Sequence, residues 1–298
     1  MTAEPNDWGG SFGPTSLPRV SVPTIDLSEG AAGVADEVRR ACEDVGFLAV
    51  LGHGMDLHLI EEVSTRSRLF FDLPDAEKER FRAPAATPGL PVYRPLGTEK
   101  LGANADRKAS LDWGPTLEGV GWPNPELRDA YERYYAEMLR VAGTLVQSFS
   151  LALGLEENRL DRFFDDRSSS LRVIDYPAGA GGARAGAHRD YGCLTIIHSD
   201  AAGLEVQTRR GDWTPVQAPP NGFVVNIGDL MQRWTGDRWV STLHRVVGQE
   251  SVSPRRQSLV FFHNPRKDAV IETLVDGTRY DPVKAGEYVL SRAAKAGL

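Results

Sequence analysis

Cysteine is scarce in this sequence, where Cys42 and Cys193 are the only two among 298 residues. Two thiols are too few for a disulfide framework or for a zinc site made of several thiolates. The scarcity favours a reducing compartment, so we expect a cytoplasmic protein. It also leaves histidine and carboxylate as the side chains that could bind a metal ion.

Long apolar runs are also missing. No stretch approaches the roughly 20 apolar residues that cross a bilayer, which argues against a membrane-spanning helix. The first residues contain no basic segment followed by an apolar one, so we expect no export signal. We interpret residues 1–20 as a flexible leader.

Basic residues are fewer than acidic ones. The 34 Lys and Arg against 41 Asp and Glu give a formal net charge of −7. Nucleic-acid binding normally requires a basic face or stripe, and this balance argues against one. The acidity is typical of a protein kept in solution by its charge. We therefore expect neither nucleic acid nor membrane as a partner, and the sequence leaves the oligomeric state open.

Helical periodicity marks the amino-terminal half. Apolar residues recur at helical spacing over 34–45, and the apolar run at 47–51 then suits a buried strand. A second helical pattern ends near Pro74. Residues 83–125 are rich in Pro and Gly without a sustained period, so we expect an ordered, loop-rich connection there.

A long helix follows, for which Asn124 is a suitable N-cap and Gly154 a suitable stop. From Ser170 to Asn264 the apolar period changes to two, which is typical of strands. We expect strands in this region at 171–176, 194–198, 204–207, 223–227, 240–247 and 258–263.

Strands this short and frequent, following a helical half, indicate a mixed α+β fold. We expect a distorted double-stranded β-helix, or jelly roll, buttressed by the N-terminal and central helices. After the leader, residues 21–120 would form an N-terminal region packed on the core. Residues 121–298 would form the catalytic jelly-roll region with the long helix, and the whole would be a single structural unit.

The triplet His188-Arg189-Asp190 follows a glycine-rich loop, Gly179 to Gly186. Side chains two apart in an extended chain point to the same side, so His188 and Asp190 can bind one ion. On its own the triplet also arises by chance or as a hydrogen-bonded surface pair. His244, flanked by apolar residues, supplies a third ligand. Two histidines and one carboxylate match the set that leaves open positions on ferrous iron.

Arg256 and Ser258 lie two apart at the start of another apolar run, on one face of an expected strand. An arginine inside a jelly roll needs an anionic partner, because an unpaired buried charge is strongly unfavourable. The guanidinium can bind a carboxylate through two hydrogen bonds and the Ser258 hydroxyl can add another, so a dicarboxylate cosubstrate fits. The alternative is a structural ion pair with an Asp or Glu of the chain.

Together these motifs resemble the isopenicillin N synthase-like 2-oxoglutarate- and iron(II)-dependent oxygenases. The resemblance covers nearly the whole chain, including Pro23 to Leu27, Gly52-His53-Gly54 and Trp122-Pro123 in the amino-terminal part. In the strand-rich part it rests on Leu171-Arg172-x-x-x-Tyr176-Pro177, His188-x-Asp190-x-Gly192, Val225-Asn226-Ile227-Gly228-Asp229, His244-Arg245-Val246 and Arg256-x-Ser258.

The resemblance implies that the two histidines and the aspartate hold Fe(II), and that Tyr176 joins Arg256 and Ser258 in binding the distal carboxylate of 2-oxoglutarate. It also implies that O2 and 2-oxoglutarate are consumed and that succinate and carbon dioxide are released. A small-molecule substrate would be hydroxylated, or desaturated or cyclised, at an unactivated C–H bond. For Tyr176 the alternative is a core aromatic at a strand end.

Two residues are candidates for contact with the substrate. Phe262 shares strand parity with Arg256 and Ser258, so it either faces the active site or is a core aromatic. Arg189 points away from its two neighbours, toward solvent or toward an anionic group at the entrance. The segment Lys108 to Trp113 lacks the acidic and aromatic pattern of many relatives, so we expect an unusual substrate pocket.

Two other functions stay open on the sequence alone. An oxidase of the isopenicillin N synthase type would dispense with 2-oxoglutarate and use Arg256, Ser258 and Tyr176 to bind its own substrate's carboxylate. A non-catalytic sensor or scaffold would bind iron or zinc without consuming oxygen. The identity of the substrate depends on loops whose roles one sequence does not specify.

Overall fold

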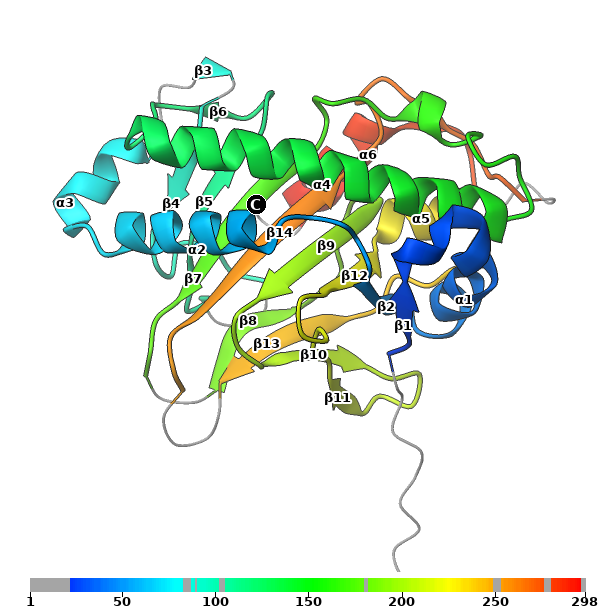
Figure 1. Ribbon diagram of the computed structural model, residues 1–298, viewed down its shortest axis with the longest axis horizontal. Coiled ribbons are helices and arrows are strands. Elements are labelled where there is room, and N and C mark those ends of the chain that lie inside the picture. Colours follow the sequence, from blue (N-terminus) through cyan, green and yellow to red (C-terminus); the bar gives the residue numbers. More distant parts are fainter. Residues whose placement is uncertain are drawn as a thin grey trace, which may run out of the picture.

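Two β-sheets packed face to face form the centre of the computed structural model (Figure 1). The structure describes residues 22–82, 87–88, 90–101, 105–179, 182–248, 253–275 and 280–295, so the expected leader at 1–20 lies outside it. Within these residues the larger sheet has eight strands, in the order β1 (Thr24–Asp26), β2 (Phe47–Leu51), β12 (Phe223–Ile227), β9 (Leu194–Ser199), β14 (Arg256–His263), β7 (Ser170–Tyr176), β5 (Ala109–Trp113) and β4 (Val92–Arg94).

The smaller sheet covers one face of the larger one and closes the jelly roll. In the described part of the chain it has four strands, in the order β11 (Trp213–Pro215), β10 (Leu204–Gln207), β13 (His244–Gly248) and β8 (Gly182–His188). All pairs in both sheets are antiparallel except β1 with β2. The expected jelly roll is confirmed, and every strand expected from the period of two is present, although β13 begins at His244 rather than at residue 240.

The long helix α4 (Pro125–Ala152) lies across the larger sheet, on the face opposite the smaller one (Figure 1). Asn124 caps its first turn, because the Asn124 side chain accepts a hydrogen bond from the Leu127 N–H at 2.8 Å. Gly154, with φ of 76°, follows its end in the left-handed conformation that favours glycine. Both ends of this helix agree with the sequence.

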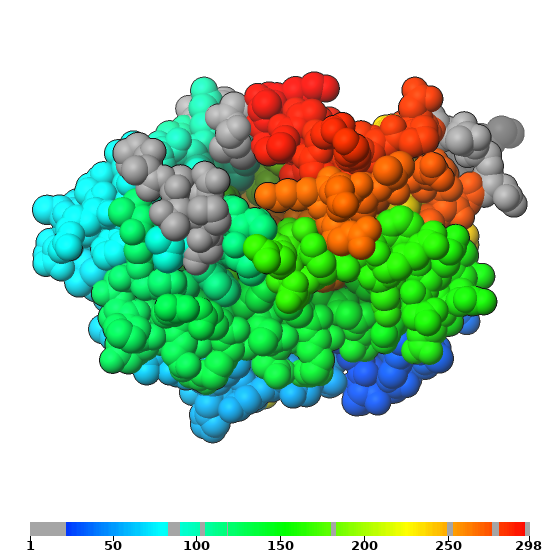
Figure 2. All heavy atoms as spheres, turned by 90° about the horizontal axis from the view of Figure 1, so that it is seen from above, coloured from blue at the N-terminus to red at the C-terminus, as the bar shows by residue number. Residues whose placement is uncertain are grey.

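The remaining helices surround α4. Two of them, α1 (Gly30–Asp44) and α2 (Leu57–Phe71), pack against α4 and buttress the sheet, as expected. Figure 2 views the molecule from the α4 side, with α4 in green across the face and the carboxy-terminal segment in orange and red beside it. Short elements complete the described chain: α3 (Asp75–Lys78), α5 (Asp229–Trp234), α6 (Ala285–Lys295), β3 (Thr87–Pro88), β6 (Glu118–Gly119), β15 (Val270–Ile271) and β16 (Val283–Lys284).

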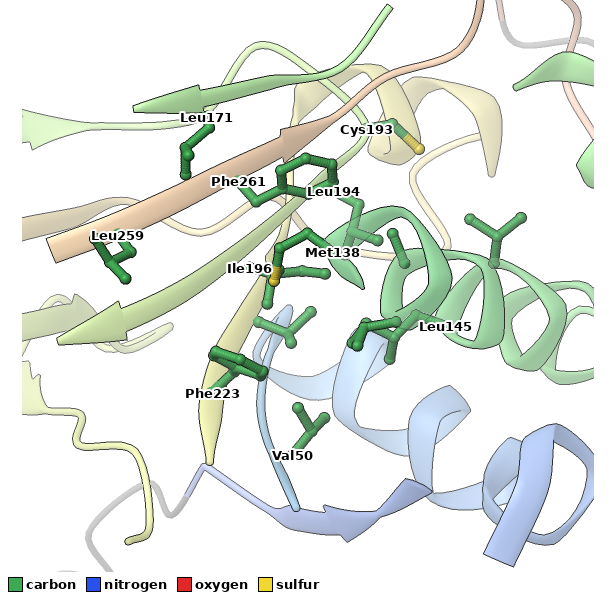
Figure 3. Close-up of a cluster of buried hydrophobic side chains, with 14 of the residues drawn as sticks. Val50, Met138, Leu145, Leu171, Cys193, Leu194, Ile196, Phe223, Leu259 and Phe261 are labelled. Atoms are coloured by element: carbon green, nitrogen blue, oxygen red, sulfur yellow. The ribbon is translucent and has the colours of Figure 1, made fainter. Parts of the chain in front are cut away.

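The main hydrophobic core lies between the helices and the larger sheet. Met138 and Leu145 of α4 point toward Ile196 of β9 and Phe223 of β12, and all four side chains are fully buried (Figure 3). A second, smaller core fills the space between the two sheets and includes Tyr176, Ile197, Val206, Val224, Val246 and Val260. This second core forms the apolar interior of the jelly roll.

One expectation about loops was incomplete and another was wrong. Residues 83–125, expected to be an ordered, loop-rich connection, also contain β4 and the wholly buried β5. Strand β5 carries Asp112, which is buried because it pairs with Arg172 of β7, and this charge interrupts the apolar pattern of the segment. The glycine-rich loop expected up to Gly186 is largely strand β8, which its pairing with β13 stabilises although Gly and Ala are weak strand formers.

The amino-terminal strands are part of the central sheet. Strand β2 pairs with β12 and strand β5 pairs with β7, while β1 and β4 extend the sheet at its two edges. The expected regions 21–120 and 121–298 therefore share one sheet and one core. Among the described residues, no helix combines the length and the apolar character needed to span a membrane.

Candidate metal centre and active site

His188, Asp190 and His244 come together at one end of the smaller sheet. Their ligand atoms all lie within 4.8 Å of one another. The Nε2 atoms of His188 and His244 lie 3.8 and 3.7 Å from the same oxygen of Asp190, Oδ1. Three donor atoms arranged around one point form a site of the size that a single metal ion needs.

Strand pairing explains this convergence. His188 ends β8, His244 begins β13, and the two residues are direct partners in the antiparallel register. Opposite residues of an antiparallel pair project to the same side, so the rings lie with their centroids 4.3 Å apart. Asp190 follows two residues after His188, as the alternation of an extended chain predicts.

Backbone carbonyls orient both imidazoles. The Nδ1 atom of His188 lies 2.8 Å from the Gly186 carbonyl oxygen, and that of His244 lies 3.1 Å from the Thr242 carbonyl oxygen. A carbonyl oxygen only accepts, so each Nδ1 carries the proton and each Nε2 presents its lone pair to the centre. This is the arrangement in which protein histidines bind metals.

The second oxygen of Asp190 is held by two donors. Thr195 Oγ1 and Asn226 Nδ2 donate to Asp190 Oδ2 at 2.6 and 2.7 Å, which leaves Oδ1 to face the histidines. Burial alone would raise the pKa of Asp190, but the two imidazoles and these hydrogen bonds outweigh it and lower the pKa. Asp190 is therefore a carboxylate, ready to bind a cation.

The donor set fits ferrous iron. Burial, with the nearby His244, lowers the pKa of His188 to about 3, so its imidazole is neutral at physiological pH. Two imidazoles and one carboxylate form a three-donor set that leaves coordination positions open, as in non-haem iron(II) oxygenases. A closed structural zinc site would require a fourth protein ligand, and among the described residues no further His, Cys, Asp or Glu joins this group.

Arg256 is a buried guanidinium inside the jelly roll, only 2% exposed. It donates to the Ala201 carbonyl at 3.0 Å, to Ser258 Oγ at 2.6 Å and to Ser199 Oγ at 2.8 Å. Among the residues that the structure describes, no carboxylate lies within ion-pair distance of it. Tyr176, its direct partner on β7, places its ring 5.1 Å from the guanidinium carbon.

The surroundings of the Arg256 guanidinium fit an anionic ligand. A buried charge without a counter-ion is strongly unfavourable, and a carboxylate placed beside Arg256 would remove that cost. Burial also lowers the pKa of Arg256, which favours binding of an anion beside it. The structural ion pair that the sequence left open as an alternative for Arg256 is absent from the described part of the chain.

Phe262, the candidate for substrate contact, lies on the interior face of β14. It is the register partner of Thr195, which bonds the metal-site carboxylate, and it is partly buried against the inter-sheet core. The guanidinium of Arg172 lies 5.9 Å from the centre of the Phe262 ring. Phe262 therefore lies between the candidate metal site and a group of charged side chains.

These charged side chains form what we call the charge network, consisting of Arg94, Glu99, Asp106, Lys108, Asp112 and Arg172. Arg172 donates two hydrogen bonds to Asp112, at 2.9 and 2.6 Å, and Arg94 donates to the same carboxylate at 2.8 Å. Three cations and three anions balance in charge. The network makes this wall of the jelly roll polar but neutral.

Lys108 connects the charge network to the metal site. Its ammonium lies 3.2 Å from Glu99 Oε2 and 3.1 Å from Asp106 Oδ2, and all three side chains are buried. The other oxygen of Asp106 accepts a hydrogen bond from the Gly186 N–H at 2.9 Å. Because the Gly186 carbonyl in turn orients His188, a continuous chain of contacts runs from Lys108 to a metal-site ligand.

Arg189, the other candidate for substrate contact, is exposed and turns away from the two site residues beside it. Its Nε donates to the Ser241 carbonyl at 2.7 Å. It lines an outer groove of about 1170 Å³ together with Arg209 and Thr242, among others. A contact between Arg189 and the substrate stays a prediction.

Three polar residues that support the site had no role predicted from the sequence: Thr195, Asn226 and Ser199. Thr195 and Asn226 hold Asp190, and Ser199 holds Arg256. One signal could have found the first two, since polar residues at interior positions of the strands that flank His-x-Asp need a buried partner. Nothing in the local sequence distinguishes Ser199 from a strand-end serine.

Comparison with known families gives two matches. Residues 22–134 match the model described as non-haem dioxygenase in morphine synthesis N-terminal, and residues 167–265 match the 2OG-Fe(II) oxygenase superfamily. The second match contains the three candidate metal ligands and the surroundings of Arg256.

Curated proteins and solved structures give similar results. The chain is 32% identical to homoarginine-6-hydroxylase 2-ODD-C23.2 of Arabidopsis thaliana, over 84% of this chain and 75% of the relative. It is 29% identical to validamycin A dioxygenase of Streptomyces hygroscopicus subsp. limoneus, over 91% and 86%. Among structures, a full-length Neurospora crassa protein in complex with alpha-KG and thymine has a TM-score of 0.82 at 27% identity, covering 92% of this chain and 96% of that one.

Proposed function

Because the chain belongs to the family of 2-oxoglutarate- and iron(II)-dependent oxygenases, we propose that its iron is held by His188, Asp190 and His244. Membership of this family gives the cofactors and the chemistry. The enzyme uses Fe(II), 2-oxoglutarate and O2 to oxidise a small molecule. The convergence of these three side chains on one point is the observation that carries the assignment.

The distal carboxylate of 2-oxoglutarate binds at Arg256, with Ser258 and Tyr176. The support is the buried guanidinium without a carboxylate partner in the described chain. Ser258 shares the interior face of β14 with Arg256, and Tyr176 lies opposite on β7. The planar guanidinium of Arg256 can donate two parallel hydrogen bonds to a carboxylate, and the hydroxyls of Ser258 and Tyr176 can supply further hydrogen bonds.

When bound, the iron would supply an oxidant by the reaction of O2 with 2-oxoglutarate, in which one oxygen atom goes into succinate as carbon dioxide is released and the other is left to oxidise the substrate. The residues of this chain bind the metal and the cosubstrate, orient the metal-binding side chains and exclude bulk water. Thr195 and Asn226 keep one oxygen of Asp190 away from the metal side, and the Gly186 and Thr242 carbonyls fix the histidine tautomers. The apolar inter-sheet core keeps bulk water from the reacting groups.

The substrate is a small polar molecule that binds beside Phe262 and the charge network. The support is the neutral balance of charged side chains on that wall, of which Arg172 approaches the Phe262 ring. A wholly apolar substrate would leave the hydrogen-bonding groups of this wall unmatched. Arg189 contributes from the outer rim, where it can meet an anionic group of an entering molecule. Hydroxylation is the expected outcome.

We also propose a cytoplasmic location and a single catalytic unit without a nucleic-acid partner. Both cysteines are buried free thiols, which suits a reducing compartment. The amino-terminal strands β2 and β5 pair with strands of the catalytic half, which suits one indivisible unit.

The first test measures metal binding and turnover in His244→Ala. Manganese(II) affinity by calorimetry and succinate release from 2-oxoglutarate with iron(II) are both expected to fall to background. His198→Ala is the matched control, because His198 lies on β9 outside the metal-site group. Retention of wild-type manganese affinity by His244→Ala would overturn the metal assignment.

The second test addresses the cosubstrate. Arg256→Met is expected to raise the KM for 2-oxoglutarate by at least tenfold, whereas Arg255→Met, at the residue just before β14, changes it little. Arg255 pairs instead with Asp72 and Asp175. Oxygen consumption with substrate but without 2-oxoglutarate would point to an oxidase of the isopenicillin N synthase type. Metal binding without any oxygen consumption would point to a sensor.

A further inference from the structure

A second arginine, Arg184 of β8, is buried near Arg256. It is 5% exposed, and its Nη2 donates to the Pro254 carbonyl at 2.8 Å and to the Pro177 carbonyl at 3.4 Å. Within the described chain, no carboxylate lies within ion-pair distance of its guanidinium. Among the residues that the structure describes, its hydrogen bonds thus go to backbone carbonyls and not to an acidic side chain.

The two carbonyls that Arg184 contacts belong to the strand ends that carry the cosubstrate site. Pro177 follows Tyr176 at the end of β7, and Pro254 precedes Arg256 by two residues at the start of β14. Tyr176 and Arg256 are themselves direct register partners. Arg184 thus reaches from the smaller sheet to the larger one and links β8 to the ends of these two strands.

The position of Arg184 is electrostatically costly without an anion. Burial lowers its pKa, and the positive charges of Arg256 and Arg107 lower it further. Two buried guanidinium groups that repel each other are tolerated at small cost only if a ligand compensates them. A dicarboxylate whose far end lies beside Arg256 would be attracted by both charges.

We propose that Arg184 is a positioning residue for the distal carboxylate of 2-oxoglutarate, which fixes the strand ends bearing Tyr176 and Arg256 and adds a second positive charge there. The inference rests on the proposed function of Arg256. It implies that Arg184 discriminates between 2-oxo acids with and without a second carboxylate. A residue that merely stabilised the fold would not make that distinction.

The test compares 2-oxoglutarate with pyruvate, a 2-oxo acid without the distal carboxylate, by calorimetric titration into the manganese(II)-loaded protein. For Arg184→Met we expect about tenfold weaker binding of 2-oxoglutarate, the effect of removing one nearby charge. Pyruvate binding should change less than twofold. Arg184→Lys, which keeps the charge but loses the planar contact with two carbonyls, should give an intermediate loss.

The controls separate this inference from the proposed function. Arg245→Met removes a β13 guanidinium that is paired with Glu205, and it should leave both affinities unchanged. If Arg256→Met weakens 2-oxoglutarate binding and neither Arg184 variant does, the role of Arg184 is refuted and the cosubstrate site stands. Equal losses for 2-oxoglutarate and pyruvate in Arg184→Lys would also refute it. If Arg256→Met has no effect, the proposed site itself fails.

Discussion

Asn226 of β12 donates a hydrogen bond to Asp190 Oδ2 at 2.7 Å and thereby fixes which oxygen of Asp190 faces the two histidines. Asn226 is 1% exposed and lies beside Thr195 in the register of β12 and β9, so two neighbouring strands hold one carboxylate. The orientation of this proposed metal ligand is thus built into the sheet rather than into a loop.

Replacing Asn226 by Leu is expected to weaken metal binding about 10- to 100-fold, the usual cost of losing a partner that orients a ligand. Asp190 would still be present but free to turn its carboxylate. Calorimetric titration with manganese(II) measures the change, and Asn158→Leu, at an exposed turn position, is the control. Unchanged affinity in a folded Asn226→Leu protein would show that Thr195 alone suffices.

A buried histidine away from the site should make stability depend on pH. Burial lowers the pKa of His263 to about 3, from an ordinary value of 6.5, and its ring stacks on Phe164 with centroids 4.6 Å apart. The folded protein keeps His263 neutral while the unfolded chain takes up a proton below pH 6.5. Stability is therefore complete above pH 6.5 and is lost as the pH falls from 6.5 toward 3.

His263→Gln should remove about 2 kcal/mol of the stability loss between pH 7 and pH 5, because glutamine does not titrate. Urea unfolding at the two pH values measures the difference. His58→Gln is the control, since the His58 side chain is 91% exposed. An unaltered pH dependence in His263→Gln would mean that other groups cause the acid sensitivity.

The convergence of His188, Asp190 and His244 and the jelly roll were predictable because each depends on a short-range sequence pattern. The spacing of His188 and Asp190 follows from strand geometry, and the caps of α4 follow from the chemistry of Asn124 and Gly154. The strand periods of β7, β9, β12 and β14 are clear because one face of each packs on the helices and the other lies inside the jelly roll.

What the sequence did not reveal depends on partners far along the chain. Strand β5 contains Asp112, whose burial makes sense only beside Arg172, about sixty residues away. Strand β8 consists largely of Gly and Ala and forms because β13 pairs with it. The contacts of Arg184 could not be predicted for the same reason, since its carbonyl partners lie on two other segments.

The packing of α4 on the sheet should account for much of the stability. Leu145 is fully buried between α4 and the sheet (Figure 3), so Leu145→Ala is expected to lower the free energy of unfolding by about 2–5 kcal/mol through lost burial and a residual cavity. Leu69→Ala, at a position 64% exposed on α2, should change it by less than about 0.5 kcal/mol. Equal effects of the two substitutions in urea unfolding would contradict this placement of the core.

The contact between Lys108 and Asp106 should be worth more than a surface ion pair, because both side chains are at most 4% exposed. Lys108→Met leaves the Asp106 carboxylate buried without a cation, which is expected to cost about 3–5 kcal/mol of stability. Lys100→Met, at an exposed position nearby, should cost little. Urea unfolding of both variants measures the difference.

The double variant Lys108→Met with Asp106→Asn tests whether the cost arises from that unpaired carboxylate. The amide is neutral and can still accept the hydrogen bond from the Gly186 N–H, so the double variant is expected to be more stable than Lys108→Met alone. Manganese(II) affinity is also expected to be higher in the double variant than in Lys108→Met, because Asp106 holds Gly186 and the Gly186 carbonyl orients His188. If the double variant is less stable than Lys108→Met, the lysine acts mainly through Glu99 and not through the contacts that lead to His188.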